Sequence, residues 1–204
     1  MTLPNPPTLR QRQAQATRDE IVAAARRLFA ERGYVDTSVA EIAEEAGVAV
    51  QTVYKSMRTK AAILMALLDA IDAEADIPAL QAGVAAATDA RELVRAGVTL
   101  TRQISERCGD IIRALASAAP VDADAATALA EGARRHRAGT AGLARRLHGL
   151  GALREGISAE DAGVQISLLT SRHAYDELVR DRGWGFDKAA MWIEHTLTTR
   201  LLRA

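Results

Sequence analysis

The sequence predicts an all-α protein, with an N-terminal helix-turn-helix domain followed by a larger helical domain. Apolar residues recur every three or four positions along most of the 204-residue chain, which is the period of an α-helix. Hydrophobic residues make up 49% of the chain and aromatic residues only 3%, a balance that favours closely packed helices over sheets. Near residue 47 a glycine separates two short helical segments, as in a helix-turn-helix.

The first helix is expected over residues 18–32. Thr17 and Glu20 have the spacing of a capping box, in which two side chains satisfy free backbone groups at a helix start. Gly33 ends this helix, whose core stripe contains Ile21, Ala25, Leu28 and Phe29. Residues 1–16, which contain prolines and glutamines, are expected to form a flexible arm.

A second capping box, Ser38 with Glu41, starts the next helix. Its apolar face consists of Val39, Ile42, Ala43 and Ala46. Gly47 follows directly and permits the positive φ that ends a helix sharply. Another short helix comes after it, so this stretch has the shape of a helix-turn-helix.

The helix expected over residues 50–56 has two unlike sides. Val53 and Met57 are its inward pair. The outward side chains are short or carry an amide, with a single cation among them: Val50, Gln51, Thr52, Lys55 and Ser56. Such side chains suit a close approach to base edges in the major groove of DNA.

Tyr54 and Lys60 are candidates for contacts with phosphate. Tyr54 places a hydroxyl on the flank of the outward face, where the phosphate oxygens of a bound duplex would lie. Lys60 follows Thr59, a suitable N-cap, so a cation and free backbone N–H groups coincide at one helix start.

The rest of the chain is expected to stay helical. No strand-like alternation and no internal repeat interrupts it. The segment 122–150 is expected to kink or split at its three glycines, Gly132, Gly139 and Gly142. The expected helices span residues 60–74, 79–87, 89–108, 110–120, 122–150, 158–181 and 188–203.

Residues 17–64 closely resemble the N-terminal domain of tetracycline-repressor-like (TetR family) transcription regulators. The resemblance rests on Phe29, Gly33-Tyr34, Thr37-Ser38, Ile42-Ala43, Ala46-Gly47-Val48, Thr52-Val53-Tyr54, and Lys60 followed by Ile63-Leu64. It implies a recognition helix at about residues 50–56, with base or groove contacts from Val50, Gln51, Thr52 and Ser56. The phosphate contacts that it implies come from Thr37 or Ser38, Tyr54, Lys55 and Lys60.

Three positions depart from the family pattern. Ala49 replaces the usual Ser or Thr that caps the recognition helix, at a cost of about 1 kcal/mol of local stability. The pair Ser56-Met57 replaces a ring side chain followed by Phe, and Ala61 replaces an acidic residue. These changes affect how DNA is read and leave the expected fold intact.

The resemblance also implies a domain organisation and a dimer. Residues 17–60 would bind DNA, a connecting helix would run from 60 to 75, and residues 76–204 would bind an effector and dimerise. Helices 159–181 and 188–203 would form a four-helix bundle around a two-fold axis, unless they close only their own domain. A homodimer would place two recognition helices about 34 Å apart and predicts a near-palindromic double-stranded DNA operator.

The effector implied by the family is a small molecule of unknown identity. Binding would be coupled to DNA release by about 1–3 kcal/mol, through the helix over residues 60–74. Each candidate wall residue is also explained as plain core: Leu100, Ile104, Ile111, Leu115, Leu143, Leu168, Arg172 and Tyr175. An anionic effector would find Arg102, Arg107 and Arg113, which are equally explained as solvated surface.

No motif indicates catalysis, a cofactor or a metal site. The four histidines, His136, His148, His173 and His195, are widely spaced and have no cysteine beside them. The single cysteine, Cys108, has no partner for an internal disulfide, which indicates a reducing compartment. Without a long apolar run or a signal-peptide core, the chain is expected in the cytoplasm and not in a membrane.

The first 18 residues contain Arg10, Arg12 and Arg18 and no acidic residue. Two interpretations remain open for them. The arm would lie along the DNA backbone or enter a minor groove, or it is a solvated tail without a partner.

Two hypotheses therefore stand. The first is a ligand-responsive, dimeric regulator of transcription that acts as a repressor. The second is an all-helical ligand-binding or enzymatic module in which the N-terminal motif is only structural. Binding to DNA separates the two.

Overall fold

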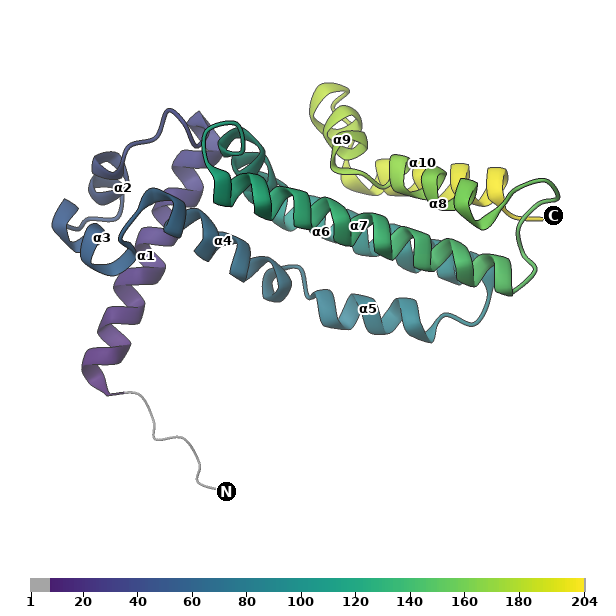
Figure 1. The fold of residues 1–204 in the computed structure, drawn as a ribbon, viewed down its shortest axis with the longest axis horizontal. Coiled ribbons are helices and arrows are strands. Elements are labelled where there is room, and N and C mark those ends of the chain that lie inside the picture. The colour runs from purple at the N-terminus through teal and green to yellow at the C-terminus, as the bar shows by residue number, and fades with distance from the viewer. Residues whose placement is uncertain (1–7, 204) are drawn as a thin grey trace, which may run out of the picture. The chain divides into compact units, whose positions relative to one another are not determined.

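The computed structural model describes residues 8–203, and over that range the chain folds into α-helices and one π-helix without a β-strand. One isolated antiparallel bridge joins Leu153 to Leu202. Figure 1 labels most of the elements, whose bounds are α1 Leu9–Arg32, α2 Val39–Glu45, α3 Val50–Met57, α4 Lys60–Glu74, α5 Ile77–Ala86, α6 Ala90–Ala118, α7 Ala123–Gly149, α8 Ala159–Leu169, α9 Arg172–Tyr175, η1 Asp176–Asp181 and α10 Phe186–Leu201. The expected all-α fold class is confirmed.

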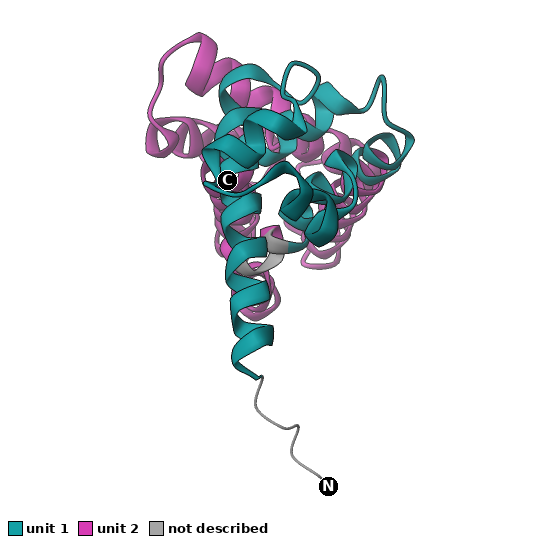
Figure 2. Ribbon diagram, turned by 90° about the vertical axis from the view of Figure 1, so that its left-hand side faces the viewer, with its two compact units in different colours: residues 1–70, 110–129 teal, residues 71–109, 130–204 magenta. Residues whose placement is uncertain are grey.

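The chain divides into two compact units, coloured separately in Figure 2. Unit 1 contains residues 1–70 and 110–129, and unit 2 contains residues 71–109 and 130–204. Unit 1 thus includes the end of α6 and the start of α7 as well as the first three helices. This division differs from the sequence-based expectation, which places residues 110–129 in the C-terminal domain of residues 76–204.

The core of unit 1 is built by α1, α2 and α3 with the first part of α4. Because α1 packs against both α2 and α3, the three helices form one small body. Its largest fully buried side chains include Ile21, Ile42, Val53, Ile63 and Leu64. Burying each of these side chains contributes about 1.5–3 kcal/mol relative to leaving it exposed.

The core of unit 2 is a continuous apolar cluster between α6, α7, α8 and α10. Its members recur at helical spacing on each helix: Leu93, Val94 and Val98 on α6, Leu143 and Leu147 on α7, Ile166 on α8, and Ile193, Leu197 and Leu201 on α10. Tyr175 is buried in the same cluster, and its ring lies 6.2 Å from that of Phe186.

Helix α1 begins nine residues before its expected start at Arg18. Its N-cap is Thr8 and not Thr17: the Gln11 amide donates to Thr8 Oγ1 at 3.3 Å, and the Thr8 amide donates to Gln11 Oε1 at 2.8 Å. Residues 8–16, which we expected as part of a flexible arm, are therefore a helix start. Arg and Gln are good helix formers, and they extend a helix that is already fixed by its packed C-terminal half.

Two further helix boundaries differ from the prediction. Helix α6 runs through Gly109, which is buried inside it, where we expected a break. The helix expected over residues 158–181 instead ends at Leu169, and Ser171 caps a new one by accepting a hydrogen bond from the Ala174 amide at 3.2 Å. The long α7, by contrast, is a single helix despite its glycines.

Candidate nucleic-acid interface

The turn between α2 and α3 is fixed by local backbone chemistry. The Ser38 amide donates to Glu41 Oε2 at 2.8 Å, and the Glu41 amide donates to Ser38 Oγ at 3.2 Å, which confirms the predicted capping box. The hydrogen bond from the Ser38 amide, and then one from the Ser38 hydroxyl to the same Oε2 at 2.7 Å, lower the pKa of Glu41. Gly47 has a φ of 66° and so ends α2 with the left-handed conformation that glycine adopts without strain.

Helix α3 turns one side into unit 1 and the other side to solvent. Val53 and Met57 are buried, whereas Val50 and Tyr54 are 40% and 52% exposed. Of the other predicted contact residues, Gln51 and Lys55 are exposed, and Thr52 and Ser56 are half-buried at the edges of the face. We call this outward side, made of residues 50, 51, 52, 54, 55 and 56, the α3 outer face.

The two hydroxyl residues before α2 lie in different environments. Thr37 is buried, and its Oγ1 donates to the Gly33 carbonyl at 2.8 Å, so this hydroxyl is used inside unit 1. Ser38 is exposed at the start of α2. Of this pair, only Ser38 has a side chain that is exposed to solvent.

The Lys60 ammonium is held by the loop before α2. Its Nζ donates to the carbonyls of Tyr34 and Thr37, both at 2.8 Å, and a third carbonyl, of Val35, lies 3.5 Å away. The same atom lies 4.2 Å from the centre of the Tyr34 ring, within the range of a cation–π contact. Burial lowers the pKa of Lys60, against the opposing effect of three nearby carboxylates.

Tyr34 connects this loop to the α6–α7 connection. Its amide donates to Ser117 Oγ at 3.2 Å, and its hydroxyl donates to Asp122 Oδ2 at 3.1 Å. Burial, and then the hydrogen bond to Asp122, raise the pKa of Tyr34 to about 12. We call Tyr34, Lys60, Ser117 and Asp122 the Tyr34 cluster.

A second link joins α1 to α6 within unit 1. Arg26 donates from two nitrogens to the carboxylate of Asp110, at 2.6 and 3.0 Å, and both side chains are mostly buried. Burial on its own would raise the pKa of Asp110, but the Arg26 guanidinium holds it below the ordinary value. Such two-point charged pairs fix orientation as well as adding energy.

Neither link was predicted from the sequence. Tyr34 was noted only as part of a family motif, and its partners Ser117 and Asp122 are 83 and 88 residues away along the chain. Asp122 was recognised only as the start of a helix. The Ala125 amide donates to Asp122 Oδ1, so this residue caps α7 and accepts from Tyr34 at once.

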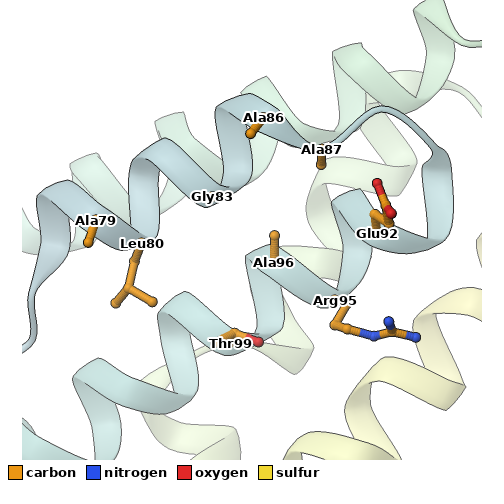
Figure 3. Close-up of a pocket in the computed structure, with 9 residues that line it drawn as sticks. All are labelled: Ala79, Leu80, Gly83, Ala86, Ala87, Glu92, Arg95, Ala96 and Thr99. Carbon is orange, nitrogen blue, oxygen red and sulfur yellow. The ribbon is translucent and has the colours of Figure 1, made fainter.

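Unit 2 has an open groove of about 390 Å³ between α5 and α6. Figure 3 shows small side chains along both helices, with Glu92 and Arg95 near one end. Both charged groups have partners: Glu92 accepts from Thr88, and Arg95 pairs with Glu194 at 3.0 Å. The groove is lined by Ala79, Leu80, Gly83, Ala86, Ala87, Glu92, Arg95, Ala96 and Thr99.

None of the eight predicted wall residues lines this groove. Leu143 and Tyr175 are buried in the unit 2 core, whereas Ile111 and Leu115 are buried in unit 1. Leu168 is 65% exposed. The remaining three are Leu100 and Ile104, both half-buried, and Arg172, whose NH1 lies 2.7 Å from Asp176 Oδ2.

Two of the arginines considered for an anionic effector already have contacts inside unit 2. Arg102 lies 2.8 Å from Asp187, and Arg107 donates to the Glu74 carbonyl at 2.9 Å.

Helices α8 and α10 lie side by side (Figure 1). Both expose apolar side chains. Val164 and Leu168, one turn apart on α8, are 55% and 65% exposed. Met191 and Trp192 on α10 are 65% and 42% exposed. We call these four residues the α8–α10 apolar patch.

The described residues contain neither a membrane-spanning helix nor a cluster of metal ligands. No helix there is both long enough and apolar enough to cross a bilayer. That same part of the chain holds no group of three or more His, Cys, Asp or Glu side chains placed to bind a metal ion.

Comparison with solved structures shows the same fold over nearly the whole chain. A putative transcriptional regulator from Saccharomonospora viridis, solved in complex with choline, superposes with a TM-score of 0.76 over 93% of this chain and all of that chain, at 20% identity. NalD, the secondary repressor of the MexAB-OprM multidrug efflux pump in Pseudomonas aeruginosa, gives a TM-score of 0.70 at 20% identity and covers 93% of this chain and 98% of its own.

Comparison with known sequences finds relatives that match part of the chain. The chain is 38% identical over 78 residues to the HTH-type transcriptional regulator TcmR of Streptomyces glaucescens, which is 38% of this chain and 34% of TcmR. It is 44% identical over 59 residues to TtgR of Pseudomonas putida, or 29% of this chain and 28% of TtgR. The chain thus matches about a third of the length of these curated relatives.

Residues 21–67 match the family described as bacterial regulatory proteins, tetR family. This range begins in α1 and ends in α4, so it contains α2, α3 and the turn between them. Over these residues, which make up less than a quarter of the chain, the sequence is that of the tetR family of bacterial regulatory proteins.

Proposed function

We propose that this protein is a DNA-binding transcriptional regulator that acts as a repressor and is released from its operator by a small molecule. The observation that carries the proposal is the α3 outer face: a short helix, fixed by a buried pair, presents small polar side chains and one cation to solvent. Such a surface fits the major groove, where amide and hydroxyl groups read base edges. A DNA-binding regulator of this family would act in the bacterial cytoplasm.

The contacts divide by chemistry. Val50, Gln51, Thr52 and Ser56 face the bases, and Ser38, Tyr54 and Lys55 reach the phosphates on either side. Lys60 adds positive charge near the backbone, but its three carbonyl contacts make it chiefly a positioning residue for the loop that carries Ser38. Thr37 supports the same loop from the inside.

The DNA-bound form is a homodimer joined through the α8–α10 apolar patch. Four large apolar side chains exposed on two adjacent helices indicate a partner surface, and a two-fold axis makes that surface complementary to itself. The dimer would present two α3 helices to successive major grooves, about 34 Å apart. The operator is therefore a near-palindrome.

The effector is a small molecule, and the α5–α6 groove is its candidate site. Small apolar side chains line most of the groove, which suits a ligand with a sizeable apolar part, and Glu92 with Arg95 offers polar contacts at one end (Figure 3). The regulator from Saccharomonospora viridis was solved with choline, so a protein of this fold takes a small organic molecule.

Selection of binding sites from a library of random duplexes tests the proposal. The purified chain should enrich one dyad-symmetric sequence with half-sites one helical turn apart, and DNA flanking its own gene should contain a copy. The second hypothesis, a ligand-binding or enzymatic module with a merely structural motif, predicts no enrichment. That result would refute the proposed function.

A further inference from the structure

Helix α1 projects beyond the body of unit 1. Its first buried residue is Ile21, twelve residues after the helix begins at Leu9. Twelve residues correspond to about 18 Å of helix at 1.5 Å per residue. Figure 2 shows these first turns standing clear of the rest of unit 1, and Figure 1 shows them reaching past α2 and α3.

The projecting segment is basic and contains no acidic side chain before Asp19. Arg10 and Arg12 are exposed, and Arg18 is half-buried. Among residues 8–203 no ion pair involves any of these three arginines, whereas four arginines on α6 and α7 lie 2.7–3.2 Å from a carboxylate: Arg95, Arg102, Arg134 and Arg135. The first turn has no acid to oppose the positive end of the helix dipole, and its capping box uses the neutral Gln11.

The arginines lie on different sides of the helix. At about 100° per residue, Arg10 and Arg18 fall within roughly 60° of Ile21, whereas Arg12 falls roughly 180° away from it. Ile21 marks the buried side of α1, and α1 as a whole packs against both α2 and α3. Arg10 and Arg18 therefore project on the side of α1 that is buried further along the helix, within unit 1.

We infer that Arg10 and Arg18 bind the phosphate backbone of the operator outside the bases that α3 reads. This inference rests on the proposed DNA-binding function. A duplex engaged by α3 continues past it in both directions, and a basic helix fixed beside α3 would meet the backbone there. The partner is chosen by charge complementarity: a polyanion supplies the negative charge that this segment lacks.

The salt dependence of binding tests this inference. Affinity of the full-length chain for its selected operator is measured by fluorescence anisotropy from 50 to 300 mM salt, for wild type and Arg10→Gln/Arg18→Gln. The slope of log K against log salt is negative, and each lost phosphate contact reduces its magnitude by about 0.9, so the loss of four contacts in a dimer reduces it by about 3.6. The affinity for scrambled DNA should fall by a similar factor, because phosphates carry no sequence.

Two control variants separate this effect from unspecific charge loss and from unfolding. Arg12→Gln/Arg91→Gln removes the same charge, from the opposite side of α1 and from α6, and should keep the wild-type slope. Arg10→Lys/Arg18→Lys keeps the charge and should restore most of the slope. Circular dichroism checks that each variant keeps the helical content of the wild type.

The possible outcomes are distinguishable. The phosphate contact is absent if Arg10→Gln/Arg18→Gln keeps the wild-type slope, or if the slope of Arg12→Gln/Arg91→Gln falls in magnitude by as much. In either case only this inference is wrong, and the proposed function stands. If the wild-type chain binds no duplex at all, the proposed function fails and this inference fails with it.

Discussion

Tyr34 shows how one side chain connects parts of unit 1 that are distant in sequence. Its backbone carbonyl accepts from Lys60 at the start of α4, and its hydroxyl donates to Asp122 at the start of α7. Tyr34 lies in the loop between α1 and α2, which leads directly into Ser38 and α2. The loop that leads into α2 is therefore held by contacts of Tyr34 inside unit 1.

Replacing Tyr34 with Phe should lower the free energy of unfolding by about 0.5–1.5 kcal/mol at pH 7, the usual contribution of one hydrogen bond. The ring and its contact with the Lys60 ammonium remain. Urea unfolding measures the change, and Tyr54→Phe, which alters an exposed hydroxyl on α3, is the matched control with little expected effect.

The same variant should change the alkaline limit of stability. The folded pKa of Tyr34, about 12, lies above its ordinary value of 10.0, so its stabilising contribution is complete below pH 10 and lost as pH rises toward 12. The Tyr34→Phe variant has no phenol to ionise, so it should not show the part of the alkaline loss of stability that comes from this hydroxyl. An identical alkaline profile and equal stability at pH 7 would show that the hydroxyl contributes nothing.

The contribution of Asp110 to folding stability should depend on pH in the acidic range. Because its folded pKa is lowered, its contribution with Arg26 is present at neutral pH and lost as pH falls through that pKa. Asp110→Asn should therefore cost about 1.5–3 kcal/mol at pH 7, and much less at pH 3, in urea unfolding. Glu131→Gln, at an exposed arginine pair on α7, should show a smaller difference at both values.

At the residue scale, the sequence predicted what depends on near neighbours. Ser38 with Glu41 and the positive φ of Gly47 follow from spacings of a few residues, and both are present. The Tyr34–Asp122 and Arg26–Asp110 contacts join residues more than 80 positions apart. Nothing in a local pattern specifies such partners.

At the element scale, the departures come from competition between local signals and packing. Gly109 was expected to end a helix, but its neighbours Cys108 and Ile111 are buried, and this packing exceeds a glycine cost of about 1 kcal/mol. The break after α8 has a local cause that was overlooked. Thr170 Oγ1 donates to the Ile166 carbonyl and Ser171 caps α9, and such hydroxyls compete with helix hydrogen bonds.

The start of α3 offers a test at this scale. Ala49 has an extended N-cap conformation but makes no side-chain cap, so α3 begins with unsatisfied amides. Ala49→Ser should supply the missing acceptor and stabilise the protein by about 0.5–1 kcal/mol in urea unfolding. Ala49→Val, which adds bulk without an acceptor, should not. Equal behaviour of the two variants would mean that this helix start needs no cap.

At the scale of the whole molecule, the proposed dimer depends on the α8–α10 apolar patch. Introducing charge there with Leu168→Glu/Met191→Glu should convert the dimer to a monomer, because two-fold symmetry places each new carboxylate in the interface twice. Sedimentation velocity measures the change. Leu150→Glu, at a side chain 51% exposed outside the patch, should remain dimeric.

If the wild-type chain is a monomer in the same experiment, the basis for a palindromic operator is removed.

The fold class and the order of the helices were predictable because helical periodicity is strong throughout the sequence. The division into two units was not, because unit 1 takes its last twenty residues, 110–129, from the middle of the chain.

The central claim is that the α3 outer face reads bases, and the most direct measurement is a specificity ratio. Affinities of wild type and Gln51→Ala/Thr52→Ala are compared on the selected operator and on a scrambled duplex at one salt concentration. The affinity of the variant for the operator should fall by about 5- to 150-fold, or roughly 1–3 kcal/mol, while its affinity for the scrambled duplex stays unchanged. An unchanged ratio would contradict the claim, because α3 would then not be the element that reads the sequence.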